Sequence, residues 1–161
     1  MNINPKLDLS FTRILDITPE QAWKGWTSPQ HYGEWFCPKP WTVSEARLDL
    51  RPGGEFFAMM KTPEGDEFPN AGCILELIPS KKFVWTSGML AGFRPADKPG
   101  ILMTAIVEFT PQGSQTKYTV TVMHANEEDC KKHEEMGFEK GWSIAADQLV
   151  EMIKHKSIDI K

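Results

Sequence analysis

Residues 137–153 read GFEKGWSIAADQLVEMI, and this stretch decides the fold. Its apolar residues recur three and four positions apart, which places them on one side of an α-helix; they are Phe138, Trp142, Ala145, Leu149 and Met152. Asn126, followed by acidic residues, suits a helix start, and Lys154 suits a helix end. We therefore expect one long helix over residues 126–154, with its apolar stripe facing a sheet.

Two glycines, Gly137 and Gly141, fall inside this expected helix. Each costs about 1 kcal/mol relative to alanine in a helix interior. The cost is offset if the glycines let another backbone approach closely, or if they leave space open beside Phe138 and Trp142.

Alternating apolar and polar residues precede this helix and predict strands. The expected strands cover residues 7–17, 43–50, 55–61, 70–78, 82–87, 101–110 and 116–124. Two short helices should follow the first strand, because Thr18 before Pro19 and Ser28 before Pro29 are helix-start signals. No strand–helix–strand alternation is sustained, so we expect an α+β fold. In it, a curved antiparallel sheet of about seven strands wraps around the long C-terminal helix.

Two segments are expected to be loops. Residues 36–42, FCPKPWT, contain two prolines and are a candidate lid that carries exposed aromatic side chains. Residues 88–100, GMLAGFRPADKPG, are rich in glycine and proline. Loops of this length inside compact domains are usually functional or mobile.

The composition narrows the class of protein. The chain has 161 residues, a net charge of −4 and three cysteines, which fits a single domain over residues 1–161. Its basic residues are scattered, which argues against nucleic-acid binding. The odd number of widely spaced cysteines indicates reduced thiols rather than a disulfide framework. No apolar run reaches signal-peptide or membrane-spanning length, so we expect a soluble cytoplasmic protein with no membrane contact. We also expect no cofactor. The oligomeric state stays open, a homodimer included.

Five motifs occur in a characteristic order: ITPEQAWKGWTSPQHYGEWFCP at 17–38, DLRPGGEF at 49–56, GCILELIP at 72–79, the hairpin ending at His124, and residues 137–153. With them the chain resembles the AHSA1-like family, named after an activator of the Hsp90 ATPase. That family lies within the START-like, SRPBCC or Bet v 1-type superfamily. The resemblance covers nearly the whole chain and implies a helix-grip fold with a small-molecule pocket. Fold kinship alone does not transfer a function.

Aromatic residues give the strongest functional signal. In a helix-grip fold the elements that carry them converge on one interior, and apolar walls with a few polar groups are typical of small-molecule sites. The alternative is that these side chains simply fill a close-packed core. The expected ligand-binding residues are Trp26, Trp35, Phe36, Phe56, Trp85, Tyr118, His124, Phe138 and Trp142.

His124 is the most interesting polar candidate. It shares the strand phase of Tyr118 and Val122, so it should point toward the buried face. It is either a structural histidine or a group that orients a ligand or transfers a proton. Glu76 is expected to face solvent, because an unpaired buried charge is costly.

The remaining candidates favour no chemistry. His133 lies in HEEMG, which lacks a second histidine four residues on, so we expect a solvated acidic helix face and no metal site. Cys73 is expected in the core, and Cys37 in the accessible aromatic loop without a cation to activate it.

We predict a domain that binds a small hydrophobic or aromatic molecule in an internal pocket. One alternative is a stress-response or chaperone-associated regulator like the Hsp90 ATPase activators, with residues 36–42 and 88–100 as partner surfaces. The other is a cyclase- or isomerase-type enzyme, which requires a polar pair such as His124 with Glu76 or Tyr118.

Overall fold

Seven antiparallel strands form one curved sheet in the computed structural model, which describes residues 2–97 and 99–155. The strands are β1 (Asp8–Leu15), β2 (Thr42–Leu48), β3 (Glu55–Lys61), β4 (Glu67–Ile78), β5 (Lys82–Thr86), β8 (Met103–Gln112) and β9 (Gln115–His124). Their spatial order is β1-β9-β8-β5-β4-β3-β2. The expected strands are all present, and none of their ends moves by more than three residues.

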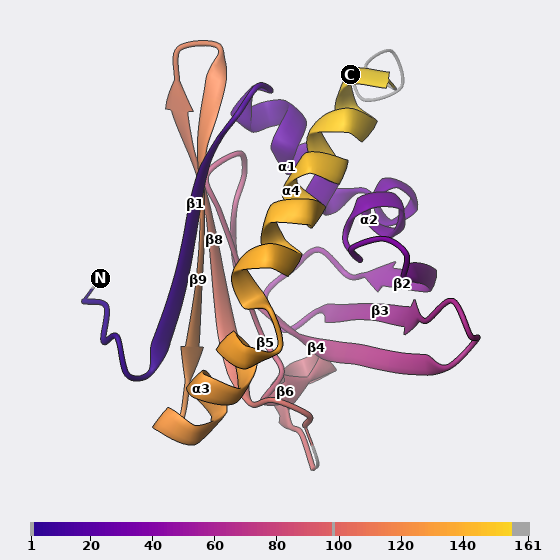
Figure 1. The fold of residues 1–161 in the computed structure, drawn as a ribbon, viewed down its shortest axis with the longest axis vertical. Coiled ribbons are helices and arrows are strands. Elements are labelled where there is room, and N and C mark those ends of the chain that lie inside the picture. Colours follow the sequence, from indigo (N-terminus) through magenta and orange to yellow (C-terminus); the bar gives the residue numbers. More distant parts are fainter. Residues whose placement is uncertain (1, 98, 156–161) are drawn as a thin grey trace.

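Three helices cover the inner face of this sheet. They are α1 (Pro19–Thr27), α2 (Pro29–Trp35) and α4 (Phe138–His155). Figure 1 shows α4 crossing in front of the sheet, with α1 and α2 beside it and the two ends of the sheet on either side. The expected α+β helix-grip architecture is therefore confirmed.

Helix α1 starts with the capping chemistry that the sequence predicts, whereas Ser28 makes no side-chain hydrogen bond at the start of α2. The N–H of Gln21 donates to Thr18 Oγ1 (3.2 Å), and the N–H of Thr18 donates to Gln21 Oε1 (2.9 Å). This reciprocal pair satisfies two backbone groups at the start of α1. Asn126 begins the next helix, α3 (Glu127–Glu135), by accepting from the N–H of Asp129 at 2.8 Å.

The expectation of one unbroken helix over residues 126–154 was wrong. The chain forms two helices, α3 and α4, which are separated at Met136 and Gly137. Gly137 has a φ of +93°, a conformation that other residues adopt only with strain. It therefore ends α3 as a left-handed cap rather than lying in a helix interior. This break lets α3 leave the axis of α4 and lie against β9 at the lower end of the sheet (Figure 1).

The first part of the expected loop at 88–100, residues 89–95, has regular structure. They hold a two-stranded ribbon of β6 (Met89–Leu90) and β7 (Arg94–Pro95) around a short 3-10 turn, Ala91–Phe93. The ribbon projects below the main sheet, near the end where α3 lies (Figure 1).

Trp26 lies at the centre of the core. Its ring is fully buried, packs against Trp35 with 5.0 Å between centroids, and stacks on Trp142 at 6.1 Å. Its indole N–H donates to the hydroxyl of Tyr118 at 3.1 Å, and the indole of Trp35 donates to the carbonyl of Gly25 at 2.9 Å. These bonds satisfy polar atoms that burial would otherwise make costly. Within residues 2–97 and 99–155, no helix combines the length and apolar character needed to cross a bilayer.

Candidate functional site

An apolar cavity lies between the sheet and the first turns of α4. Its volume is about 170 Å³. Six elements and the segment after α2 contribute to its wall: Phe36, Pro38, Met60, Asn70, Trp85, Met103, His133, Gly141, Trp142 and Ala145. An apolar cavity of about 150 Å³ can hold a benzene molecule. This inner cavity therefore has room for about one aromatic ring.

Gly141 keeps part of this space empty. A Cβ placed on it would meet no atom closer than Pro38 Cγ at 3.8 Å, which is an ordinary contact. Alanine would therefore fit, yet glycine costs about 1 kcal/mol in a helix interior. The helix glycines were expected either to let another backbone approach or to leave space open. Gly141 leaves space open, beside Trp142.

A second cavity of about 680 Å³ lies next to the first. Both share four wall residues, Met60, Asn70, Met103 and His133, so the larger one forms an outer cavity that leads to the inner one. Much of the outer wall comes from Ala96, Asp97, Pro99, Gly100 and Ile101. Its rim is apolar and exposed: Phe68 is 50% and Met136 67% accessible.

Two histidines form a polar chain beside these cavities. His124 Nδ1 lies 2.8 Å from the carbonyl oxygen of Leu7, and His124 Nε2 lies 2.9 Å from His133 Nδ1. His124 is buried, whereas His133 is half-buried and lines both cavities. The His133 ring also packs edge-on against Phe138, with 5.4 Å between centroids.

Burial lowers the pKa of His133 from its ordinary 6.5 to about 4, and the neighbouring His124 contributes to the shift. The ring is therefore uncharged at neutral pH. Because the unfolded chain binds this proton more tightly, the neutral ring stabilises the fold fully above about pH 6.5. That contribution is lost as the pH falls from 6.5 through 4. The expectation that His133 lies on a solvated helix face was wrong, because the break at Gly137 turns α3 toward the sheet.

Asn70 is the second polar side chain common to both cavities. It lies on β4 opposite Ala58 of β3, and its amide has no hydrogen-bond partner among the residues that the structure describes. An amide can donate and accept. Asn70 and His133 are thus the groups that could orient a molecule within the otherwise apolar walls of the inner cavity.

The expected ligand-binding residues divide into two groups. Phe36, Trp85 and Trp142 line the inner cavity. The others line neither cavity and are buried in the core instead: Trp26, Trp35, Phe56, Tyr118, His124 and Phe138. His124 reaches the cavity only through His133.

Residues 36–42 were a candidate lid, but hydrogen bonds hold the start of this segment against α4. The side-chain amide of Gln148 donates to the carbonyls of Trp35 (2.9 Å) and Cys37 (3.0 Å). Its oxygen accepts the N–H of Lys39 at 3.0 Å. Gln148 thereby holds Phe36 and Pro38 in place as one wall of the inner cavity.

The thiols are buried. Cys37 was expected to be accessible, but it is 6% exposed, and burial raises its pKa to about 11. Cys73 is in the core as expected, and burial also raises the pKa of Cys130. A thiol that stays protonated is a poor nucleophile. Among the described residues no group of three potential ligands is arranged to hold a metal ion.

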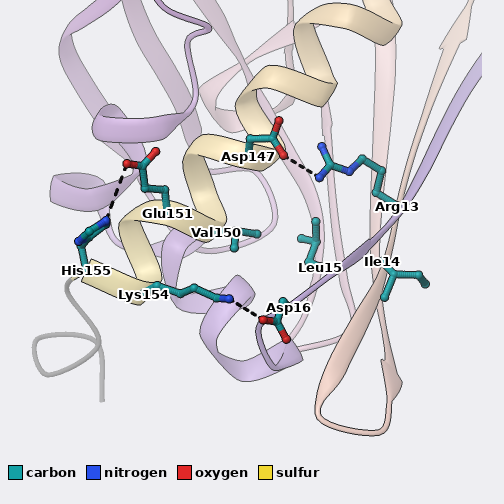
Figure 2. A pocket seen from close by; sticks show the side chains of 9 residues that line it. All are labelled: Arg13, Ile14, Leu15, Asp16, Asp147, Val150, Glu151, Lys154 and His155. Atoms are coloured by element: carbon teal, nitrogen blue, oxygen red, sulfur yellow. Dashed lines mark hydrogen bonds and ion pairs between the residues drawn. The ribbon is translucent and has the colours of Figure 1, made fainter.

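A third hollow, of about 380 Å³, lies between β1 and the C-terminal half of α4 (Figure 2). Two ion pairs cross it, Arg13 with Asp147 at 2.6 Å and Lys154 with Asp16, and His155 lies 3.8 Å from Glu151 on the same helix. Exposed pairs of this kind contribute little stability. Because these charges already satisfy one another, the groove offers a weaker ligand site than the inner cavity.

Several wall residues were absent from the sequence-based set: Pro38, Met60, Asn70, Met103, His133 and Ala145. Strand phase could have identified two of them. Met60 lies on the same strand face as Phe56 and Ala58, and Met103 lies on the same face as Ala105. His133 gave no such signal, because its position depends on the break between α3 and α4.

Comparisons with known proteins agree with this architecture. The family model described as Activator of Hsp90 ATPase homolog 1-like protein matches residues 16–154. A crystal structure of a protein from Nitrosomonas europaea is 44% identical, with a TM-score of 0.93 over 97% of this chain and 99% of that one. A crystal structure from Rhodobacter sphaeroides (19% identity, TM-score 0.81, 96% and 97% covered) is similar in fold. So is the solution structure of an AHSA1-like protein from Aeromonas hydrophila (16% identity, TM-score 0.72, 96% of each chain covered). None of the curated proteins matches this chain.

Proposed function

Because the chain belongs to the Activator of Hsp90 ATPase homolog 1-like family and carries an apolar cavity, we propose that it binds a small hydrophobic or aromatic molecule. The observation that carries this proposal is the apolar inner cavity of about 170 Å³, which adjoins the outer cavity. A completely filled core would bury these apolar side chains, whereas Met60, Met103 and Trp142 each stay partly exposed along the cavity wall.

The walls suit such a ligand. Phe36, Trp85 and Trp142 offer aromatic faces, and the methionines Met60 and Met103 offer flexible, polarisable side chains at the junction of the two cavities. The fully buried residues behind them, including Trp26 and Phe56, fix the aromatic walls in position. Apolar walls with few polar groups are the usual form of a small-molecule site.

Methionine methyl NMR with p-xylene tests the proposal. Saturable shifts are expected at the methyl groups of Met60 and Met103, which line the cavities, and not at Met123, which lies outside them. A response that does not saturate, or that is equal at Met123, would refute binding in the inner cavity.

A second candidate function is docking to a chaperone, which is favoured by the family's description and by the exposed apolar rim. Phe68, Leu90 and Met136 form that rim and are each at least 43% exposed. An ATPase assay with Hsp90 separates the two roles. Stimulation that is lost in Met136→Ser supports docking, and absence of stimulation by the unmodified chain rules it out.

The polar pairs considered for an isomerase are not assembled. Glu76 is paired with Lys82 at 3.0 Å on the outer side of the sheet. Tyr118 and His124 lie on the same strand six residues apart, which separates them by roughly 20 Å.

A further inference from the structure

The hydrogen bonds of the histidine pair fix where its protons lie. The carbonyl of Leu7 can only accept, so His124 Nδ1 carries the hydrogen that it receives. In a neutral ring the other nitrogen then has no hydrogen, so His124 Nε2 accepts. Its partner at 2.9 Å, His133 Nδ1, must therefore donate.

This order gives His133 one defined hydrogen-bond acceptor for a ligand. With its hydrogen on Nδ1, a neutral His133 has a lone pair on Nε2, which points away from His124. Nε2 has no hydrogen-bond partner among the described residues, and it is not one of their buried, unpaired atoms. Since Nε2 is accessible and His133 lines both cavities, we infer that this lone pair faces their junction.

We propose that the ligand is an uncharged, mainly apolar molecule with one O–H or N–H group, which donates a hydrogen bond to His133 Nε2. This inference rests on the proposed function, since it names the class of molecule that the same cavity takes. A phenol or another aromatic molecule with a single donor fits the one-ring volume of the inner cavity.

The electrostatics of the site agree with this choice. Burial keeps His133 uncharged at neutral pH, so no positive charge there attracts a carboxylate or phosphate. Asp97 lines the outer cavity and repels anions from the entrance. His124 acts as a positioning residue, because it holds the His133 hydrogen on Nδ1 without touching the ligand.

Binding of p-cresol and p-xylene provides the test, because the two molecules have nearly the same shape and differ by a hydroxyl in place of a methyl group. The ratio of their dissociation constants is measured for the unmodified chain and for His133→Phe. Loss of one neutral hydrogen bond should reduce the preference for p-cresol by about fivefold, with p-xylene binding retained. His155→Phe, the same exchange outside both cavities, should leave the ratio unchanged.

A spectroscopic measurement avoids any doubt about folding of the variant. In the unmodified chain, the Nε2 resonance of His133 should have the position of an unprotonated ring nitrogen. It should shift with p-cresol but not with p-xylene. In His124→Leu the Nε2 signal should move toward the averaged position of two exchanging tautomers, an effect that a merely structural role would not produce.

The outcomes separate the two levels of the argument. If neither p-cresol nor p-xylene binds saturably, the proposed function fails and this inference fails with it. If both bind and His133→Phe leaves their ratio unchanged, the cavity binds ligands but His133 does not select them. If acetophenone, which only accepts hydrogen bonds, depends on His133 instead of p-cresol, the proton order is the reverse of the one inferred.

Discussion

Replacing Gly141 with alanine should stabilise the protein and weaken ligand binding at the same time. Gly141 lies within α4, where alanine is about 0.8–1.0 kcal/mol more favourable. The new methyl group would meet Pro38 Cγ at 3.8 Å, so no clash reduces this gain. For a chain of this size, about 1 kcal/mol corresponds to a rise in Tm of about 2–4 °C.

The same methyl group enters the cavity of about 170 Å³. Crowding by one methylene-sized group typically costs about 1–3 kcal/mol, so the affinity for p-xylene should fall on the order of tenfold. Gly141→Leu occupies more of the cavity and should abolish p-xylene binding while the chain stays folded. Thermal unfolding followed by circular dichroism gives the Tm, and methionine methyl NMR gives the affinity.

Gly33→Ala is the matched control. Gly33 lies in α2, and its added Cβ would sit 3.5 Å from Val43 Cγ1 and 3.8 Å from Ala46, again without a clash. This variant should raise the Tm by a similar amount and leave p-xylene affinity unchanged. The reasoning is refuted if Gly141→Ala lowers the Tm, or if it raises the Tm and p-xylene still binds as before.

Four further predictions concern residues around the site. Stability should fall by about 1–2 kcal/mol between pH 6.5 and 4 as His133 becomes protonated, a value reduced from about 3 kcal/mol because the ring is partly exposed to solvent. Urea titrations over this range should show a flatter pH dependence for His133→Phe. Gln148→Leu should destabilise the fold by about 1–3 kcal/mol, because the buried carbonyls of Trp35 and Cys37 lose their donor. It should also weaken p-xylene binding, because Phe36 is no longer held in the cavity wall. An unchanged urea midpoint would contradict this. Arg13→Met should destabilise the fold by about 1 kcal/mol, chiefly through loss of the part-buried bond that Arg13 donates to the Ser143 carbonyl of α4, and leave ligand affinity unaltered; any loss of affinity would assign the groove a binding role. Iodoacetamide should leave Cys37 unmodified until the chain unfolds, and rapid native labelling detected by mass spectrometry would show the buried position to be wrong.

Local rules were sufficient for most of the fold. The capping box at Thr18, the alternation in the strands and the stripe from Phe138 to Met152 each act over a few residues, so the sequence displays them directly. The element order follows from them, whereas the helix-grip arrangement was what the resemblance to the AHSA1-like family implied. The candidate site was predicted only in part. Phe36, Trp85 and Trp142 line the cavity, whereas Trp26 and Tyr118 are buried in the core behind it.

The sequence by itself determined that an apolar helix would lie on an antiparallel sheet rich in aromatic residues. It could not determine where that helix begins, because glycine adopts both helical and positive φ values at similar cost. Only the tertiary structure showed Gly137 at φ +93° and Gly141 beside open space. The same break brings His133 to His124, nine residues away along the chain, and to the cavity wall. That contact depends on the angle between two helices, which no local pattern of residues specifies.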